Sequence, residues 1–198
     1  MRALLRLAAA VLPLLPIAAA PAPTGPMETA APAIFLVAKP ELLDPNFAQA
    51  VVLVVFPKDG GPVGVILNRP LTLTLKDAFP DQPQLRDRSE HLYFGGPVSV
   101  NALMFLMRRS PAPQNAFPVT DDLYLSGDGE LLDRLLAKQE GTVERFFLGY
   151  AGWAMTQFEF EVAQGAWYVI PADEETVLKA DPQTLWRDLI LRATAIKA

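Results

Sequence analysis

Residues 44–70, which read DPNFAQAVVLVVFPKDGGPVGVILNRP, constrain the fold most strongly. Two Val-rich apolar runs, Ala50–Phe56 and Val63–Leu67, are separated by a short segment of Pro, Asp and Gly. β-Branched runs bounded by turn residues are typical of strands, and so short a connection predicts an antiparallel hairpin. The first run is almost continuously apolar, which indicates a central strand covered on both faces.

Polar turn residues lie at the two outer ends of this predicted hairpin. The Asp44 side chain can bond backbone amides two residues on, and Asn46 tolerates left-handed dihedral angles. Asn68 and Arg69 precede a proline, which favours an extended backbone. Because the outer ends of an antiparallel pair lie side by side, we expect a partly exposed polar cluster, either structural or ligand-binding. We expect Asp44 to be structural and Arg69 to be available for binding.

The composition is that of a single globular domain, with 51% hydrophobic and 20% charged residues among 198. The absence of cysteine excludes disulfides, thiolate nucleophiles and cysteine zinc sites. The chain has one histidine, His91, so a metal site with several histidine ligands is excluded. Ser89 and Glu90 are too close to His91 in the sequence to form a catalytic triad with it. No catalytic residue, metal ligand or cofactor is therefore predicted.

The first residues resemble a secretory signal peptide. Arg2 and Arg6 form a basic region, and an apolar run ends in the small residues Ala18–Ala20. We predict a signal peptide at 1–20, a Pro/Ala-rich linker at 21–32 and one domain at 33–198, exported to the periplasm or secreted, with no transmembrane span after cleavage. Two alternatives stay open: the segment is retained as an anchor, or Met27 is the true start and the protein is cytoplasmic.

The charge argues against a nucleic-acid partner. The formal net charge is −5, and removing residues 1–20 takes away two arginines and no acid, leaving −7. Nucleic-acid binders need a basic face to neutralise phosphates. The only dense basic spots, Arg86/Arg88 and Arg108/Arg109, are interpreted as solvated surface charge.

The rest of the chain mixes strands and helices without a regular βαβ alternation, which predicts the α+β class. Pro70–Leu75 alternates Leu and Thr, and 102–108 reads as either strand or helix. Asp128 and Asp181 are predicted helix caps, with Pro182 at the first helical position of the terminal helix. The remaining expected strands are 34–38, 91–94, 122–125, 143–150 and 166–170, and the expected helices are 75–79, 129–139, 155–162, 173–179 and 183–195.

Two further motifs are candidate sites. Gly95-Gly96 allows a tight turn and a close backbone approach, but it lacks the Lys-Ser/Thr ending of a phosphate loop. Gln157, Glu159 and Glu161 follow the aromatic sequence GYAGW. Glu159 and Glu161 are i, i+2 neighbours, which do not face each other on a helix, so this pair is not expected to act as two catalytic carboxylates.

Three blocks in order resemble the YqgE/AlgH family: DPNF with its hairpin, FGGPV, and GYAGWAMTQFEFEVAQGAWYVIP. The chain departs from the family pattern at Ala50 and Pro57, where Ser and His are usual, and at Thr156 and Phe158, where Gly and Leu are usual. The resemblance implies a single α+β domain with a coiled, partly bifurcated, mostly antiparallel sheet and flanking helices. It implies no established biochemical activity.

Three functions follow as hypotheses. The first is a non-enzymatic binding or regulatory protein that contacts an unknown protein or small molecule. The second is an enzyme that uses Asp44, Glu159 or Arg69 in a cleft. The third is a DNA-binding transcriptional regulator, as members of the resembled family are often called, although no helix-turn-helix is found here. The candidate binding residues are Asp44, Asn46, Asn68, Arg69, Gly95, Gly96, Gln157 and Glu159.

Overall fold

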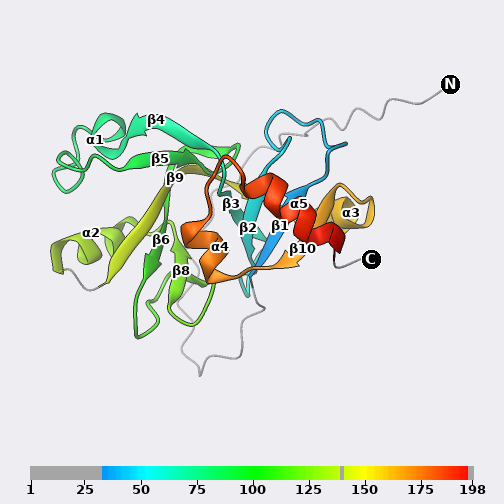
Figure 1. Cartoon of the computed structure of the whole chain (residues 1–198). Helices are drawn as coiled ribbons and strands as arrows, with labels where there is room; N and C mark the ends of the chain where they lie inside the picture. Colours follow the sequence, from blue (N-terminus) through cyan, green and yellow to red (C-terminus); the bar gives the residue numbers. More distant parts are fainter. Residues whose placement is uncertain (1–32, 139–140, 196–198) are drawn as a thin grey trace.

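The computed structural model describes residues 33–138 and 141–195 (Figure 1). The predicted signal peptide at 1–20 and linker at 21–32 lie outside the described residues. The described chain forms a ten-stranded sheet with helices on both sides. The predicted α+β class with a mostly antiparallel sheet is confirmed.

One half of the sheet has the strand order β10-β1-β2-β3. These strands are β1 (Ile34–Ala38), β2 (Val51–Val55), β3 (Val63–Ile66) and β10 (Trp167–Pro171), all paired antiparallel. The predicted hairpin is present as β2 and β3, with Val52 opposite Ile66 and Val55 opposite Val63. Every residue of β2 is buried, as expected for a central strand covered on both faces.

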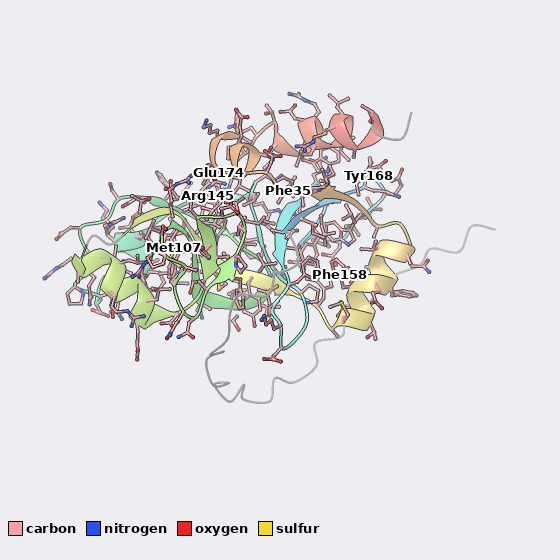
Figure 2. All side chains as sticks on the ribbon, turned by 90° about the horizontal axis from the view of Figure 1, so that it is seen from below. Phe35, Met107, Arg145, Phe158, Tyr168 and Glu174 are labelled. Atoms are coloured by element: carbon pink, nitrogen blue, oxygen red, sulfur yellow. The ribbon has the colours of Figure 1, made fainter. Side chains whose placement is uncertain are left out.

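Helices cover both faces of this half (Figure 2). Phe35, Leu53 and Val65 face α4 (Glu174–Lys179) and α5 (Leu185–Ala195) within one apolar core cluster. On the other face, the cluster around Leu36 and Val52 packs against the loop between β1 and β2 and against α3 (Met155–Ala163). Alternate side chains of one strand thus enter two separate cores.

The other half of the sheet contains the remaining strands, and α1 (Leu75–Ala78) and α2 (Gly129–Lys138) lie over one of its faces (Figure 1). The long strand β9 joins the halves, because it pairs with β3, β5 and β6. Its pairing with β5 is parallel, whereas the other pairs are antiparallel. The strands are β4 (Pro70–Thr74), β5 (His91–Phe94), β6 (Val98–Arg108), β7 (Phe117–Pro118), β8 (Leu123–Ser126) and β9 (Thr142–Gly152).

Some boundaries differ from the sequence prediction. The ambiguous segment 102–108 is strand, and β6 begins earlier, at Val98. The terminal helix was predicted from Gln183, with Pro182 at its first position, but α5 begins at Leu185. The Asp181 side chain accepts from the Gln183 N–H, and the Asp181 carbonyl accepts from Thr184 and Leu185. Residues 182–184 are therefore a turn in front of the helix, with Pro182 inside that turn. The Asp128 cap is confirmed by its bond from the Leu131 N–H.

Two glycines are required where backbones approach closely. A Cβ on Gly61, in the turn between β2 and β3, would lie 1.7 Å from the Trp153 carbonyl oxygen. A Cβ on Gly96 would lie 2.3 Å from the Tyr150 carbonyl carbon, and Gly96 has a φ of +154°. The two contacts bring neighbouring segments against β9 and the residue that follows it, so any side chain at either glycine would push the two backbones apart.

Candidate functional site

Asn68 lies at the end of β3 and ties this strand to the loop before β2. Its side-chain oxygen accepts from the Val51 N–H at 2.9 Å, and its amide nitrogen donates to the Gln49 carbonyl at 2.8 Å. Val51 is fully buried. The Asn68 side chain therefore extends the ladder between β2 and β3 by replacing a backbone partner, a structural use of the amide.

Arg69 reaches the same loop from the next position. Its two terminal nitrogens donate to the carbonyls of Pro45, at 3.3 Å, and Ala48, at 3.0 Å. Its guanidinium carbon is 6.0 Å from the centroid of the Phe94 ring. Burial lowers the pKa of the Arg69 guanidinium from its usual value, and the charge of the Asp44 carboxylate opposes that shift.

The loop itself is closed by Asp44, whose carboxylate accepts from the Asn46 N–H at 2.8 Å. The predicted cluster of Asp44, Asn68 and Arg69 is thus present at one end of the hairpin. Its polar groups are directed at backbone partners, however. The expectation that Arg69 is available for binding differs from the structure, because both terminal nitrogens hold loop carbonyls.

Gly95 and Gly96 lie beside this cluster but are buried. The Gly95 carbonyl accepts from the Ile66 N–H, and the Gly95 N–H donates to the Leu148 carbonyl. The Phe94 N–H donates to the Arg69 carbonyl. These two glycines therefore allow β3 and β9 to meet the segment after β5. Their surroundings are backbone and the Phe147 side chain.

Gln157 and Glu159 lie on α3, which covers the sheet face next to the cluster. Gln157 donates to the Glu161 carboxylate at 2.9 Å, and Glu159 is exposed. Within the described residues, neither forms a hydrogen bond or ion pair with Asp44 or Arg69. The three residues of the enzyme hypothesis, Asp44, Glu159 and Arg69, are thus not joined into one constellation.

Sequence reasoning missed the role of Glu161. One oxygen of its carboxylate accepts from the indole N–H of Trp153, at 3.0 Å, and from that of Trp167, at 3.2 Å. Both indoles are nearly buried, and a buried indole N–H needs an acceptor. The two tryptophans on either side of the EFE sequence were the available signal. Phe47 stacks near both, with centroids 6.2 and 5.7 Å away, and links this aromatic group to the loop.

Arg108 forms another cluster that the sequence did not reveal. Its guanidinium nitrogens lie 2.6 Å from Asp122, 2.7 Å from Glu174 and 3.8 Å from Glu144. Hydrogen bonds to Glu174 and Asp122 raise the pKa of Arg108 above its already high usual value. The cluster joins β6 and β9 to the start of α4, and its cation is surrounded by acids.

Unlike these clusters, the end of the molecule around α3 and β10 carries exposed apolar side chains. Three of the seven exposed large hydrophobic residues among the described positions lie on these two elements: Met155, Phe160 and Val169. Phe160 is 56% exposed, and α3 has no fully buried residue. Concentration of apolar groups at one end is typical of contact surfaces, whereas scattered single residues need no explanation.

The described residues contain no group of three or more His, Cys, Asp or Glu side chains placed to hold a metal ion. No helix within the described ranges is long and apolar enough to cross a membrane.

Comparisons with known proteins agree on one family. Residues 35–196 match the model of the AlgH-like family. A UPF0301 protein from Cytophaga hutchinsonii is 35% identical over 160 residues, covering 78% of this chain and 85% of that protein. A UPF0301 protein from Streptomyces avermitilis is 36% identical over 162 residues, covering 79% and 83%.

Two solved structures are similar. The solution structure of the AlgH protein from Pseudomonas aeruginosa has a TM-score of 0.65 and 28% identity, covering 86% of this chain and 91% of that one. The crystal structure of protein DIP2367 from Corynebacterium diphtheriae has a TM-score of 0.64 and 23% identity, covering 85% and 90%, and supports the fold alone. The names of these proteins state no substrate or reaction.

Proposed function

The chain belongs to the AlgH-like family, and from this premise we propose that it acts by binding another protein rather than by catalysing a reaction. The observation that carries the proposal is the pair of exposed apolar side chains on α3, Met155 and Phe160, which we call the α3 surface. Helices with a bulky aromatic side chain on the solvent side are typical of recognition surfaces, where aromatic residues and Met are enriched.

The position of Phe160 on α3 supports this choice. Phe158 packs toward the sheet, with its ring 5.7 Å from Phe56 and 6.2 Å from Trp153 (Figure 2). Phe160 is two residues further along the helix, which turns its side chain about 200° away. Phe158 and Glu161 hold the helix to the sheet, so Phe160 is not needed for that packing. Exposure of this apolar side chain to water is unfavourable, and burial against a partner would be favourable.

The polar cluster supports binding in an indirect way. Asn68 and Arg69 hold the loop before β2, and Phe47 joins that loop to the tryptophans under α3. The α3 surface is therefore mounted on a rigid base. Such a base reduces the entropy that is lost on binding.

A DNA-binding function is not favoured. Within the described residues, Arg88, Arg108, Arg134, Arg187 and Arg192 each form an ion pair with a carboxylate. Paired arginines cannot neutralise phosphates without losing those partners, and the whole chain carries −5.

Site-specific photo-crosslinking tests the proposal. A photoreactive phenylalanine analogue placed at position 160 of the full chain in native cells should give a discrete protein adduct. The matched control is position 100, where Val100 is 51% exposed on β6, away from α3. The expected result is an adduct at 160 and none of the same mass at 100. Equal adducts at both positions, or none at 160, would contradict the proposal.

A further inference from the structure

Among the described residues, β10 is the last strand of its half of the sheet and pairs with β1 alone. The Ala172 N–H donates to the Ala33 carbonyl, and the Lys39 N–H donates to the Ala166 carbonyl. Because hydrogen-bonded pairs alternate along an antiparallel ladder, residues 166, 168, 170 and 172 face β1. Trp167, Val169 and Pro171 therefore point their backbone groups away from the sheet. Among the described residues no hydrogen bond reaches the Trp167 or Val169 N–H.

This free edge lies at the floor of a groove of about 370 Å³. Val162 of α3 lines one wall and Ala193 of α5 lines another. These helices cover opposite faces of the sheet, so the groove follows the edge of β10 between them (Figure 2). We call it the edge groove; Lys39, Trp167, Tyr168 and Val169 complete its main lining.

Within residues 33–138 and 141–195, little protects this edge from pairing with another strand. Natural edge strands are usually protected by charged residues, bulges or proline. The sequence WYVIP of β10 has no charge, its pairing with β1 is regular, and its one proline is the last residue. Val169 is 46% exposed at the centre of the edge. The strand thus offers two donors and three acceptors beside an apolar side chain.

Lys39 adds a charge at the Trp167 end. Its ammonium lies 5.1 Å from the centroid of the Tyr168 ring and close to Gly165. Within the described part of the chain, no carboxylate forms an ion pair with it. An acidic side chain of an occupant would meet this ammonium next to the groove, where partial burial strengthens the attraction.

We propose that the edge groove binds a single extended segment of another protein, which adds a strand to β10, places apolar side chains against Val162 and Val169, and presents an acidic residue to Lys39. This is strand addition, in which main-chain bonds supply affinity and side chains supply specificity. The inference rests on the proposed binding function and specifies the form of the partner.

A second copy of the chain fits this edge less well. A twofold axis at Val169 would set Trp167 against Pro171 of the other copy at both ends of the ladder. Since proline lacks an N–H, two of the six possible bonds would be lost. The second copy would also bring its own α3 and α5 against the walls of the groove, whereas a single extended segment brings none.

The test uses the full chain and a phage-displayed library of random ten-residue peptides. We expect enrichment of peptides that alternate apolar and polar residues and contain Asp or Glu. Val169→Pro should weaken the selected peptides at least tenfold, because it removes the central donor of the edge. Since that N–H faces away from β1, the substitution should leave the sheet intact, as Pro171 does. Val169→Thr, which keeps the donor, is the matched control.

Two further variants make the result decisive. Val169→Glu keeps the backbone donor but adds a charge to the edge, and it should also abolish binding of the selected peptides. This variant replaces Val169→Pro in the test if Val169→Pro is poorly folded. Lys39→Gln should weaken acidic peptides three- to tenfold and leave peptides with Gln in place of the acid unchanged. Melting temperatures of all variants check that the fold is retained.

Peptides that bind Val169→Pro and Val169→Glu as tightly as Val169→Thr would overturn the inference, as would a library without enriched sequences. A wild-type dimer in sedimentation velocity that Val169→Pro dissociates would also overturn it, by assigning the edge to a second copy. If the adduct at position 160 forms and is unaffected by Val169→Pro, the proposed function stands and the inference about the edge fails.

Discussion

The polar cluster at the end of the β2–β3 hairpin and the edge groove at β10 belong to the same half of the sheet, but they use backbone groups in opposite ways. In the cluster, the side chains of Asn68 and Arg69 satisfy the N–H of Val51, the first residue of β2, and three carbonyls of the loop before it. At β10, the outward backbone groups of Trp167 and Val169 have no such partner among the described residues.

The difference shows that polar residues in turn motifs do not indicate a binding site when their side chains form hydrogen bonds with backbone N–H and carbonyl groups. Asp44, Asn68 and Arg69 look like a ligand site in the sequence because they are polar and close together. Their hydrogen bonds identify them as loop supports. The surface that we propose for a partner consists of exposed apolar side chains and a strand edge without a neighbour among the described residues, and no polar motif marks it.

Among the polar side chains that support the backbone, the largest effect on stability is expected for Asn68→Ala in the cluster. Truncation leaves the buried Val51 N–H and the Gln49 carbonyl without their partner. An unsatisfied buried donor costs about 1–3 kcal/mol, so we expect a loss of about 2 kcal/mol in the free energy of unfolding, measured in urea. Asn46→Ala is the control, since only the Asn46 backbone is bonded in the loop, and a change below about 0.5 kcal/mol is expected there. Equal losses of unfolding free energy in Asn68→Ala and Asn46→Ala would contradict a structural role for the Asn68 side chain.

The next largest loss of stability is expected for a substitution in α3. This helix contains both a residue that supports the fold, Glu161, and an exposed residue without that role, Glu159. Glu161→Ala should lower the free energy of unfolding by about 1–2 kcal/mol, because two nearly buried indole N–H groups lose their acceptor. Tryptophan fluorescence should change as well, since Trp153 and Trp167 surround the lost carboxylate. Glu159→Ala, two residues away and exposed, should change neither quantity. A fluorescence spectrum that stays constant in both variants would argue against this carboxylate as the support of α3.

A smaller effect is expected for Arg69→Lys. Lysine carries the same charge, but a single ammonium does not reproduce the planar fork that spans the Pro45 and Ala48 carbonyls. We expect a loss of about 1 kcal/mol, in the range of one partly exposed hydrogen bond. Arg86→Lys, at an exposed position, is the control. If Arg69→Lys is as stable as wild type, the charge rather than the fork holds the loop.

Much of the fold was predictable because it depends on local patterns. The Val-rich runs, the turn between them and the Asp128 cap each carry their signal within a few residues. The position of β10 at the edge does not, because WYVIP reads as a buried strand and only the pairing of distant segments decides which strand is last. The same applies to the length of β6 and to its contact with β9.

The candidate site divides in the same way. The meeting of Asp44, Asn68 and Arg69 followed from hairpin geometry and was predictable. The direction of the Arg69 guanidinium, back onto the loop carbonyls, depends on where the loop lies in space. Glu161 was considered only as a partner of Glu159, although the nearby tryptophans each needed an acceptor. A count of buried donors and acceptors would have found it.

The smallest effect on stability, and the largest difference between stability and binding, is expected for Phe160→Ser. The Phe160 side chain is 56% exposed, so its removal should change the free energy of unfolding by less than about 0.5 kcal/mol. Phe158→Ser, on the same helix, should cost about 2 kcal/mol or more, because the ring packs against Phe56 and Trp153. With a photoreactive analogue at the exposed position 156, four residues before Phe160 and therefore on the same face of α3, the adduct should be lost in Phe160→Ser while the melting temperature is retained. Retention of that adduct, or a large loss of stability, would move Phe160 from the binding surface to the structural group that already contains Asn68, Arg69 and Glu161.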